Sequence, residues 1–403
     1  MSQLRIAVIG AGIIGAAVAR EITLRASGAQ VTVIEKENHP AAHQSGHNSG
    51  VVHAGLYYEP GGLKATLCRR GVGLLKEFCA DHQVAYEECG KLVVALNDDE
   101  TSRLHEIHRK AVANGVPDIE IVNRDRIREI EPNASGKVAL HSPHTAIVDF
   151  PGVTNALVQE VKRSGGQILL STEVVGIHNY SHHVTVETTA GDFDFDHLIV
   201  CGGLQSDRLA RMSGNTSGPK IIPFFGQYSQ LAPEYTDLVN GLIYPVPDPA
   251  YPFLGVHVTK HISGETLVGP NAFLSLGREN YSGWDINLAD SLAIAGCPGF
   301  WRFASGNIKT AVLEIRSVLS RQSFIRSAAA YIPALADARS EPFPRGIRAQ
   351  AMNEDGSLVD DFVINHSGRA TLVRNAPSPG ATSSLAIAEY IVDRHARVHD
   401  LAL

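Results

Sequence analysis

The fold is decided near the start of the chain, where residues 4–22 read LRIAVIGAGIIGAAVAREI. The apolar beginning of this stretch predicts a buried parallel strand, and the part from Ile13 onward, rich in small and apolar residues, predicts a helix. Between them, Gly10, Gly12 and Gly15 have the spacing G-x-G-x-x-G, which provides a tight turn, a close backbone approach to a pyrophosphate and close packing of helix on strand. The positive end of the helix then faces the phosphates.

A second predicted strand carries the acid that completes this fingerprint. Residues 30–36 read QVTVIEK, and Glu35 stands twenty residues after Gly15. A carboxylate in this position accepts hydrogen bonds from the adenosine ribose and favours NAD or FAD over NADP. Residues 37–65 are rich in glycine, serine and histidine, where an NAD-binding domain would continue with another βαβ unit, and long loops of this kind are usually functional. The sequence therefore predicts a dinucleotide site, with a plain tight turn between strand and helix as the alternative.

Length, charge and cysteine spacing limit the function classes. With 403 residues, the chain exceeds the size at which one hydrophobic core stops growing, so we expect two domains. The formal net charge of −7 argues against general nucleic-acid binding, which requires a surplus of Lys and Arg. The five cysteines show no C-x-x-C spacing, so neither a disulfide framework nor a zinc site is predicted. The absence of a signal-peptide pattern and of an apolar run of about 18 residues predicts a cytoplasmic protein.

Four further motifs follow the fingerprint, namely HNSGVVHAGLYYEPGGLKATLC, YPVPDPAYPFLGVHVT, RGIRAQ and NAPSPGATSSLAIAEYI. In this order they resemble the FAD-dependent oxidoreductases of the D-amino-acid oxidase/glycine oxidase superfamily, and within it the L-2-hydroxyglutarate oxidase/dehydrogenase family. The resemblance implies an α/β fold with a Rossmann-like FAD-binding domain built from discontinuous segments, and an α+β substrate domain with a mixed or antiparallel sheet. The FAD-binding domain is expected at 1–90, 145–218 and 340–403, and the substrate domain at 91–144 and 219–339.

The resemblance implies FAD as the cofactor. Some superfamily members tether the flavin through a cysteine near the motif that matches RGIRAQ, and because no cysteine lies there in this sequence, we expect non-covalent binding. The loop at 45–50 would follow the pyrophosphate and flavin, and the helix after Pro379 would stabilise negative charge on the reduced flavin. The alternative for the helix after Pro379 is an ordinary capped helix that follows a loop ended by proline, with no role at the flavin. Val174 is expected to contact the adenine, unless its strand is merely structural. The expected cofactor-binding residues are Gly10, Gly12, Ile14, Gly15, Glu35, Ser45, Asn48, Ser49, Gly50, Val174, Gly202, Gly203, Pro379, Gly380, Thr382 and Ser383.

Oxidation of a 2-hydroxy acid requires a base for the C2 hydroxyl, an acceptor for the C2 hydride and a cation for the carboxylate. His53 and His257 are the candidate bases because both lie in apolar runs within family-like motifs, and a satisfied core histidine is the alternative for each. Arg348 is the candidate carboxylate ligand, since a guanidinium binds a carboxylate through two hydrogen bonds. The other substrate-binding candidates are Tyr58, Lys64, Gln227, Thr259 and Gln350, with a solvated face as the alternative for Tyr58 and Lys64.

The resemblance implies oxidation of L-2-hydroxyglutarate to 2-oxoglutarate by hydride transfer to flavin N5, followed by reoxidation by oxygen or a quinone-type acceptor. The alternatives are another 2-hydroxy acid or an amino acid as substrate, or a non-catalytic flavin-binding protein. One departure bears on the substrate contacts. Where the family has P-F-R-G-(D/E)-Y, residues 223–228 read PFFGQY, so Phe225 and Gln227 stand in place of two charged residues.

Two weaker patterns concern a metal and a membrane. His43 and His47 have a spacing that suits a metal pair on a helix, but their glycine- and serine-rich context is not helical and no third ligand is evident, so no metal is expected. Residues 299–332 combine aromatic and basic side chains, which favours an amphipathic helix pair or a peripheral contact with anionic lipid at the inner face of the plasma membrane. The basic residues of this segment are Arg302, Lys309, Arg316, Arg321 and Arg326.

Overall fold

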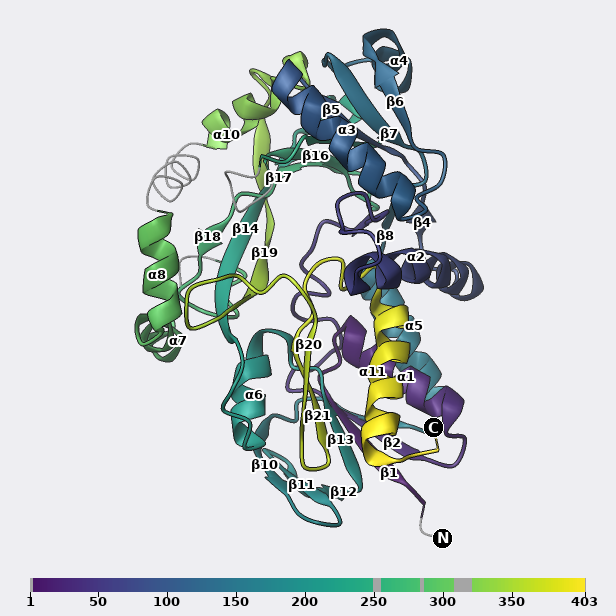
Figure 1. The fold of residues 1–403 in the computed structure, drawn as a ribbon, viewed down its shortest axis with the longest axis vertical. Helices are drawn as coiled ribbons and strands as arrows, with labels where there is room; N and C mark the ends of the chain where they lie inside the picture. Colours follow the sequence, from purple (N-terminus) through teal and green to yellow (C-terminus); the bar gives the residue numbers. More distant parts are fainter. Residues whose placement is uncertain (1–2, 249–254, 283–285, 308–320, 403) are drawn as a thin grey trace.

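The computed structural model describes residues 3–248, 255–282, 286–307 and 321–402. Two main sheets organise this part of the chain, one of six strands in the lower half of Figure 1 and one of nine strands in the upper half. The first belongs to the expected FAD-binding domain and the second to the expected substrate domain. The predicted α/β class is confirmed.

The six-stranded sheet has the order β20-β21-β13-β1-β2-β9. Its strands run parallel except for β20, which pairs antiparallel with β21 at one edge. The predicted first strand and the strand before Glu35 are adjacent in this sheet, as the fingerprint requires. The strand bounds are β1 Arg5–Ile9, β2 Gln30–Ile34, β9 Gln167–Leu169, β13 His197–Val200, β20 Val363–Ser367 and β21 Ala370–Asn375.

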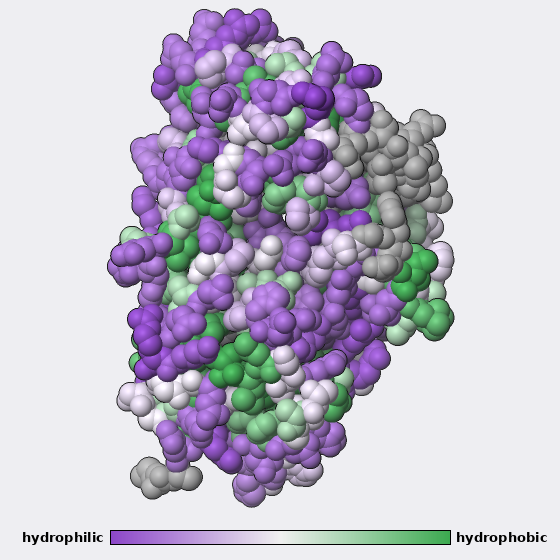
Figure 2. All heavy atoms as spheres, turned by 180° about the vertical axis from the view of Figure 1, so that it is seen from behind, coloured by the Kyte–Doolittle hydropathy of each residue, from purple (hydrophilic) through white to green (hydrophobic). Residues whose placement is uncertain are grey.

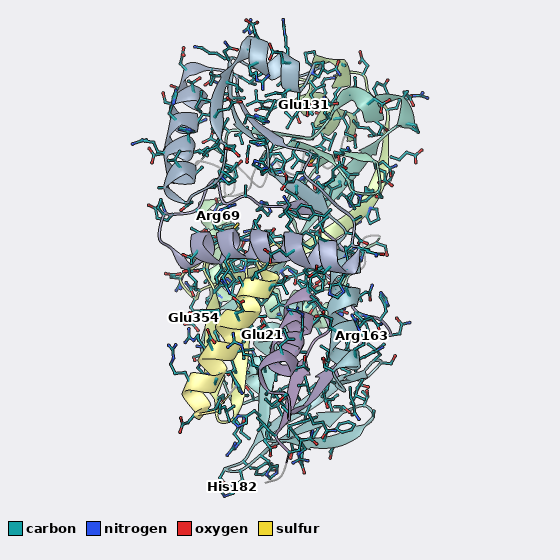
Figure 3. All side chains as sticks on the ribbon, turned by 90° about the vertical axis from the view of Figure 1, so that its right-hand side faces the viewer. Glu21, Arg69, Glu131, Arg163, His182 and Glu354 are labelled. Atoms are coloured by element: carbon teal, nitrogen blue, oxygen red, sulfur yellow. The ribbon has the colours of Figure 1, made fainter. Side chains whose placement is uncertain are left out.

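Both faces of this sheet are covered, which explains why β1 is apolar at consecutive positions. Ile6 and Val8 pack among helices on one face, and Ala7 and Ile9 pack toward a three-stranded antiparallel sheet on the other. Figure 3 shows α2, which carries Arg69, lying across the ends of α1 and α11, between the two halves of the molecule. The covering elements are α1 Ile13–Arg25, α2 Leu63–His82, α5 Phe150–Arg163, α6 Ser206–Met212, α11 Ser384–His399, β10 Val174–Asn179, β11 Val184–Thr188 and β12 Gly191–Phe195.

The nine-stranded sheet has the order β18-β14-β17-β16-β15-β5-β7-β6, with β19 paired along β14. The sheet is mixed, because β15 runs parallel to β5 whereas all other neighbouring strands of the sheet pair antiparallel. Its strands are β5 Lys91–Ala95, β6 Glu120–Asn123, β7 Val138–Ser142, β14 Lys220–Leu231, β15 Leu242–Pro245, β16 His257–Lys260, β17 Thr266–Gly269, β18 Phe273–Leu274 and β19 Ser340–Met352.

Side chains alternate along β5 between two apolar layers. Leu92 and Val94 pack with residues of α10, and Val93 and Ala95 pack with residues of α3. The helices of this half are α3 Asp98–Ala113, α4 Arg124–Ile130, α7 Leu288–Ala295, α8 Pro298–Gly306 and α10 Arg321–Ala328. Short 3-10 turns span Gly203–Gln205, Pro233–Leu238 and Pro333–Leu335, and a small sheet joins β3 Val51–Val52, β4 Tyr86–Glu87 and β8 Ala146–Val148.

The last domain boundary differs from the expected one. Residues 340–403 were expected in the FAD-binding domain, but β19 begins at Ser340 and pairs with β14 over nearly the full length of β19. The strand therefore belongs to the sheet of the substrate domain, and the chain returns to the six-stranded sheet only at β20. The family-like motif RGIRAQ lies within β19.

The segment at 299–332 lies only partly within the described residues. Its basic residues Lys309 and Arg316 lie outside them, whereas α8 and α10 form the helices that the pattern predicted at its two ends. Along the described parts of the chain, we find no helix with both the length and the apolar character to cross a membrane.

Candidate active site

A cavity of about 1040 Å³ lies between the two halves of the molecule and is lined by both. Its wall includes the ends of β1, β2 and β13, the start of α1 and the loop before α11, together with residues of β14, β15, β16 and β19. Most of the residues proposed from the sequence meet here. They are Gly10, Gly12, Ile14, Gly15, Glu35, Ser45, Asn48, Ser49, Val174, Gly202, Gly203, Pro379, Gly380 and Thr382 from the cofactor set, and His53, His257, Arg348 and Gln350 from the substrate set.

Six of the proposed residues do not line this cavity. Gly50 adopts φ +71° in the turn into β3, so it shapes the backbone of the loop. Tyr58 borders a small neighbouring pocket, and the ammonium of Lys64 lies 2.9 Å from Asp360 and faces the Tyr58 ring. The remaining three are Gln227, Thr259 and Ser383.

The glycine fingerprint has the geometry that a dinucleotide turn needs. Gly10 has φ +99°, a conformation that side chains rarely adopt, and a Cβ on it would lie 2.5 Å from the carbonyl oxygen of Cys201. A Cβ on Gly15 would lie 1.9 Å from the carbonyl oxygen of Gly10, so only glycine allows this contact of helix and strand. The nearest atom to a Cβ on Gly12 is the Ser45 hydroxyl oxygen, at 3.3 Å. The cavity therefore reaches the backbone at the start of α1.

Polar side chains hold this part of the wall in place. Glu35 is buried, and its carboxylate accepts hydrogen bonds from the backbone N–H groups of Ala11, at 2.7 Å, and Glu37, at 2.9 Å. Ser45 Oγ accepts a hydrogen bond from the N–H of Ile13 in the first turn of α1, at 2.9 Å. Asn48 Nδ2 donates to the carbonyl oxygens of Gln44 and Ser45, so it orders the loop that passes over the helix end.

The loop before α11 forms the opposite part of the wall. Residues 376–382 line the cavity, and the hydroxyl oxygen of Thr382 accepts a hydrogen bond from the N–H of His53 at 3.1 Å. Helix α2 packs directly on this turn, because a Cβ on Gly71 would lie 2.5 Å from Cα of Ser383. The loop that leads into α11 therefore lines the cavity, which brings the amino end of this helix close to it.

His53 and His257 lie near Lys91, a buried lysine that was not among the residues predicted from the sequence. The ammonium of Lys91 lies 3.7 Å from the centroid of the Tyr244 ring and 5.0 Å from that of Tyr57. On its other face, Tyr244 stacks on His257, with ring centroids 3.6 Å apart and an angle of 15° between the planes. Three adjacent strands, β5, β15 and β16, supply Lys91, Tyr244 and His257 in this layered arrangement.

The electrostatics of this cluster keep both imidazoles neutral. Burial, with the charges of Lys91 and Lys64, lowers the pKa of His53 to about 3. Burial, Lys91 and His53 lower the pKa of His257 well below its usual range. Burial also lowers the pKa of the Lys91 ammonium, to about 7.

The two histidines differ in their contacts. His257 Nε2 is buried without a hydrogen-bond partner among the described residues, so its lone pair or proton is available to a ligand. His53 Nε2 lies 3.4 Å from the hydroxyl oxygen of Ser378, at the limit of a hydrogen bond. Both side chains line the cavity.

Arg348 and Gln350 enter the cavity from β19. Solvent reaches Arg348 through the cavity, although the surrounding protein lowers the pKa of its guanidinium. Gln350 is buried, and its Nε2 donates to the carbonyl oxygen of Ala351 at 3.0 Å while Oε1 has no partner among the described residues. A planar cation and a neutral amide on one strand provide a place for a carboxylate.

The two unusual residues of β14 point away from the cavity. Gly226 and Tyr228 line it, whereas their neighbours Phe225 and Gln227 do not, and the pairing of β14 with β19 is irregular between Gly226 and Tyr228. The N–H of Gln227 donates to Asn271 Oδ1 at 2.8 Å, and Phe225 is buried in an apolar cluster. The departure from the family pattern therefore lies behind the wall. Thr259 also lies behind it, where it hydrogen-bonds the Tyr244 side chain.

The residues missed from the sequence share one property. Lys91, Tyr244 and Tyr57 each occur at the edge of an apolar stretch, and the only indication was a lysine at the first position of the strand KLVVA. Their role depends on contacts between strands that are distant in sequence. His43 and His47 were considered as a metal pair. His43 groups instead with Glu37, 3.0 Å away, and with Glu279, whereas His47 stacks on Tyr281.

This cavity suits FAD on structural grounds. It offers a glycine turn with a free backbone surface, a carboxylate at the end of β2, and the starts of two helices at one continuous wall. These features define a dinucleotide-binding site, and the FAD dependent oxidoreductase family designated DAO matches residues 5–394. The chain belongs to this family.

Particular relatives are similar over nearly the whole chain. It is 41% identical to the L-2-hydroxyglutarate dehydrogenase of Escherichia coli (strain K12), over 96% of this chain and 92% of that protein. It is 39% identical to the mitochondrial L-2-hydroxyglutarate dehydrogenase of Homo sapiens, over 97% of this chain and 88% of that protein. Among solved structures, L-alpha-glycerophosphate oxidase from Mycoplasma pneumoniae with FAD bound has a TM-score of 0.76 at 21% identity, covering 97% of this chain and 94% of that one.

Proposed function

We propose that the protein oxidises L-2-hydroxyglutarate to 2-oxoglutarate. Bound FAD supplies the acceptor for the C2 hydride. The observation that carries the proposal is the convergence of His53, His257 and Arg348 on one cavity whose other wall fits FAD. The similarity to L-2-hydroxyglutarate dehydrogenases over nearly the full length supports this substrate.

In this proposal the residues of β19 bind the substrate carboxylate. Arg348 holds it through two hydrogen bonds, which fixes the orientation of C2 in the cavity. The charge of Lys91 adds a positive field from behind Tyr244 and attracts a dianionic substrate. Residues 376–382 and the start of α11 exclude water from the opposite side and place partial positive charge there.

One of the two neutral imidazoles accepts the proton of the C2 hydroxyl. Substrate carboxylates bring negative charge next to His53 and His257, which raises the pKa of both from their low values and strengthens them as bases. The free Nε2 favours His257, whereas the contact of His53 Nε2 with Ser378, in the loop before α11, favours His53. The other imidazole then donates a hydrogen bond to the substrate.

The experiment compares anaerobic flavin reduction by L-2-hydroxyglutarate in the wild type, His53→Ala and His257→Ala. The wild type should reduce its flavin, and replacing the base should slow reduction by about two to four orders of magnitude while substrate still binds. The other substitution should act mainly on substrate affinity. Reduction at the wild-type rate by both variants would rule out a histidine base.

The rival functions are separable by the same measurement. Faster reduction by another 2-hydroxy acid or an amino acid would replace the substrate and keep the enzyme class. No reduction by any of them would instead support a non-catalytic flavin-binding protein.

We also propose a cytoplasmic enzyme that passes electrons to oxygen or to a quinone-type acceptor at the inner face of the plasma membrane. Exposed apolar side chains on and next to α7 and α8 support membrane contact, namely Ile286, Leu288, Leu292 and Trp301. Apolar side chains are visible at this edge of the molecule in Figure 2. Flotation with anionic vesicles should recover the wild type and lose Leu288→Glu. Equal recovery of both proteins would contradict the contact.

A further inference from the structure

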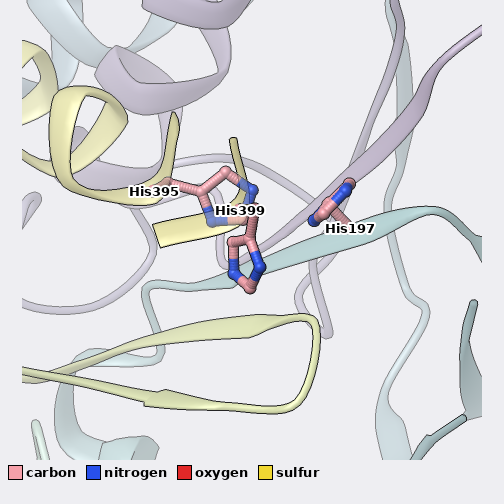
Figure 4. A group of neighbouring side chains, drawn as sticks. All are labelled: His197, His395 and His399. Carbon is pink, nitrogen blue, oxygen red and sulfur yellow. The ribbon is translucent and has the colours of Figure 1, made fainter. Parts of the chain in front are cut away.

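Three histidines gather at the end of the six-stranded sheet that faces away from the cavity. Figure 4 shows His395 and His399 on the last turns of α11 and His197 at the start of β13. The opposite ends of the same two elements, at Cys201 and Thr382, line the cavity. The cluster is therefore separate from the candidate active site.

The distances between the three rings suit a shared metal ion. The ring centroids are 4.6 Å apart for His395 and His399, 4.8 Å for His197 and His399, and 5.2 Å for His197 and His395. One nitrogen from each ring lies within 4.8 Å of the other two. A tetrahedral zinc ion, with Zn–N bonds of about 2.0 Å, places its nitrogen ligands about 3.3 Å apart. Small rotations of the rings would close this difference.

Each ring has a nitrogen that lacks a partner. Nδ1 of His197, Nε2 of His395 and Nε2 of His399 are buried without a hydrogen-bond partner among the described residues. His395 is 0% exposed and His197 4%, so water does not replace the missing partners of these two. Buried polar nitrogens of this kind are costly unless a ligand satisfies them. A metal ion would satisfy all three at once.

The protonation state of the cluster also suits a metal, because neutral imidazole is the form that binds one. Burial and the neighbouring histidines lower the pKa of His395 to about 2, and burial, His399 and Arg369 lower that of His197 to about 4. Asp196 acts in the opposite direction on His197. Burial, His366 and Arg369 lower the pKa of His399.

A second layer of contacts orients the ring of His395. Its Nδ1 lies 2.7 Å from Thr371 Oγ1, which in turn lies 3.0 Å from His366 Nδ1. If His395 Nδ1 donates to this hydroxyl, the lone pair of Nε2 points to the centre of the cluster. Metal-binding histidines usually have such a partner on the other nitrogen.

We propose that His197, His395 and His399 bind one zinc ion, which ties the carboxyl-terminal end of α11 to the sheet, with water as the fourth ligand. Arg369 opposes this binding, because its Nη1 lies 3.2 Å from His197 Nε2, which must carry the proton once Nδ1 binds zinc. The guanidinium also donates to the carbonyl oxygen of Ser181 through Nε and to that of Asp196 through the same Nη1. Zinc binding therefore requires Nη1 to turn from the imidazole, and the contact of Nε with Ser181 can remain.

The test uses FAD-loaded protein stripped of metal with a chelator and then dialysed against zinc chloride. The wild type should retain one equivalent of zinc, and His399→Asn should bind it at least about tenfold more weakly. The matched control is His105→Asn, which changes an exposed histidine on α3, in the other half of the molecule (Figure 1). No zinc retention by the wild type, or equal retention by both variants, would overturn the proposal.

Two further measurements do not depend on the folding of a core variant. Arg369→Gln removes the opposing N–H and supplies an oxygen that can accept from His197 Nε2–H. The affinity for zinc should therefore rise about tenfold. Unchanged or weaker zinc binding would contradict His197 as a ligand. Cobalt(II) added to the wild type should give tetrahedral ligand-field absorption at longer wavelengths than the flavin. An octahedral spectrum would overturn the three-histidine site.

Discussion

At the scale of single residues, the buried ammonium of Lys91 sets the electrostatics of the candidate active site. Lys91 is 3% exposed, lies between the rings of Tyr57 and Tyr244, and has its pKa lowered by burial to about 7. Its charge helps to keep His53 and His257 neutral. This arrangement is unfavourable for the folded protein alone, and under the proposed function a dianionic substrate would offset it.

The stability of the protein should depend on pH through Lys91. The folded-state pKa lies below the usual value of 10.5, so between about pH 7 and 10.5 the unfolded chain binds more protons and stability rises with pH. Lys91→Met should remove this rise and increase the free energy of unfolding at pH 7 by up to a few kcal/mol. Urea unfolding of both proteins at pH 7 and about 9.5 measures this difference. The same pH dependence in both would refute the buried charge.

At the scale of elements, the contact between α2 and the start of α11 holds the loop that lines the cavity. Gly71 makes this contact possible, because a Cβ there would lie 2.5 Å from the backbone of Ser383. Gly73 is on the same helix, but a Cβ there would meet nothing within 4 Å. The two glycines therefore form a matched pair for testing the contact.

Gly71→Ala should move α2 away from α11, destabilise the protein by about 1–3 kcal/mol and reduce the FAD retained after purification. Gly73→Ala should leave FAD content unchanged and stabilise the helix by about 0.5–1 kcal/mol. Flavin absorbance per chain and thermal unfolding report both effects. Equal FAD content in the two variants would show that this helix contact does not shape the cofactor site.

At the scale of the whole molecule, local sequence patterns predicted the residues of the FAD-binding domain better than those of the substrate domain. The fingerprint and Glu35 depend on spacing within one βαβ unit, and the structure places both at the cavity. Lys91 and Tyr244 were missed because their contact depends on the parallel pairing of β15 with β5, which joins strands far apart in the chain. The assignment of Ser340–Met352 to the FAD-binding domain was wrong for the same reason, because the sequence of a strand does not show which strand it pairs with.

A single-turnover measurement with the flavin-loaded wild type under anaerobic conditions tests the proposed oxidation of L-2-hydroxyglutarate most directly. L-2-hydroxyglutarate should bleach the flavin and yield one 2-oxoglutarate per FAD, and readmission of an acceptor should restore the colour. The D enantiomer, lactate and glycine should react far more slowly, because they lack the second carboxylate or present the wrong face of C2 to Arg348 and the histidines. Bleaching by one of these compounds at a higher rate than by L-2-hydroxyglutarate, or no 2-oxoglutarate in the product, would contradict the account.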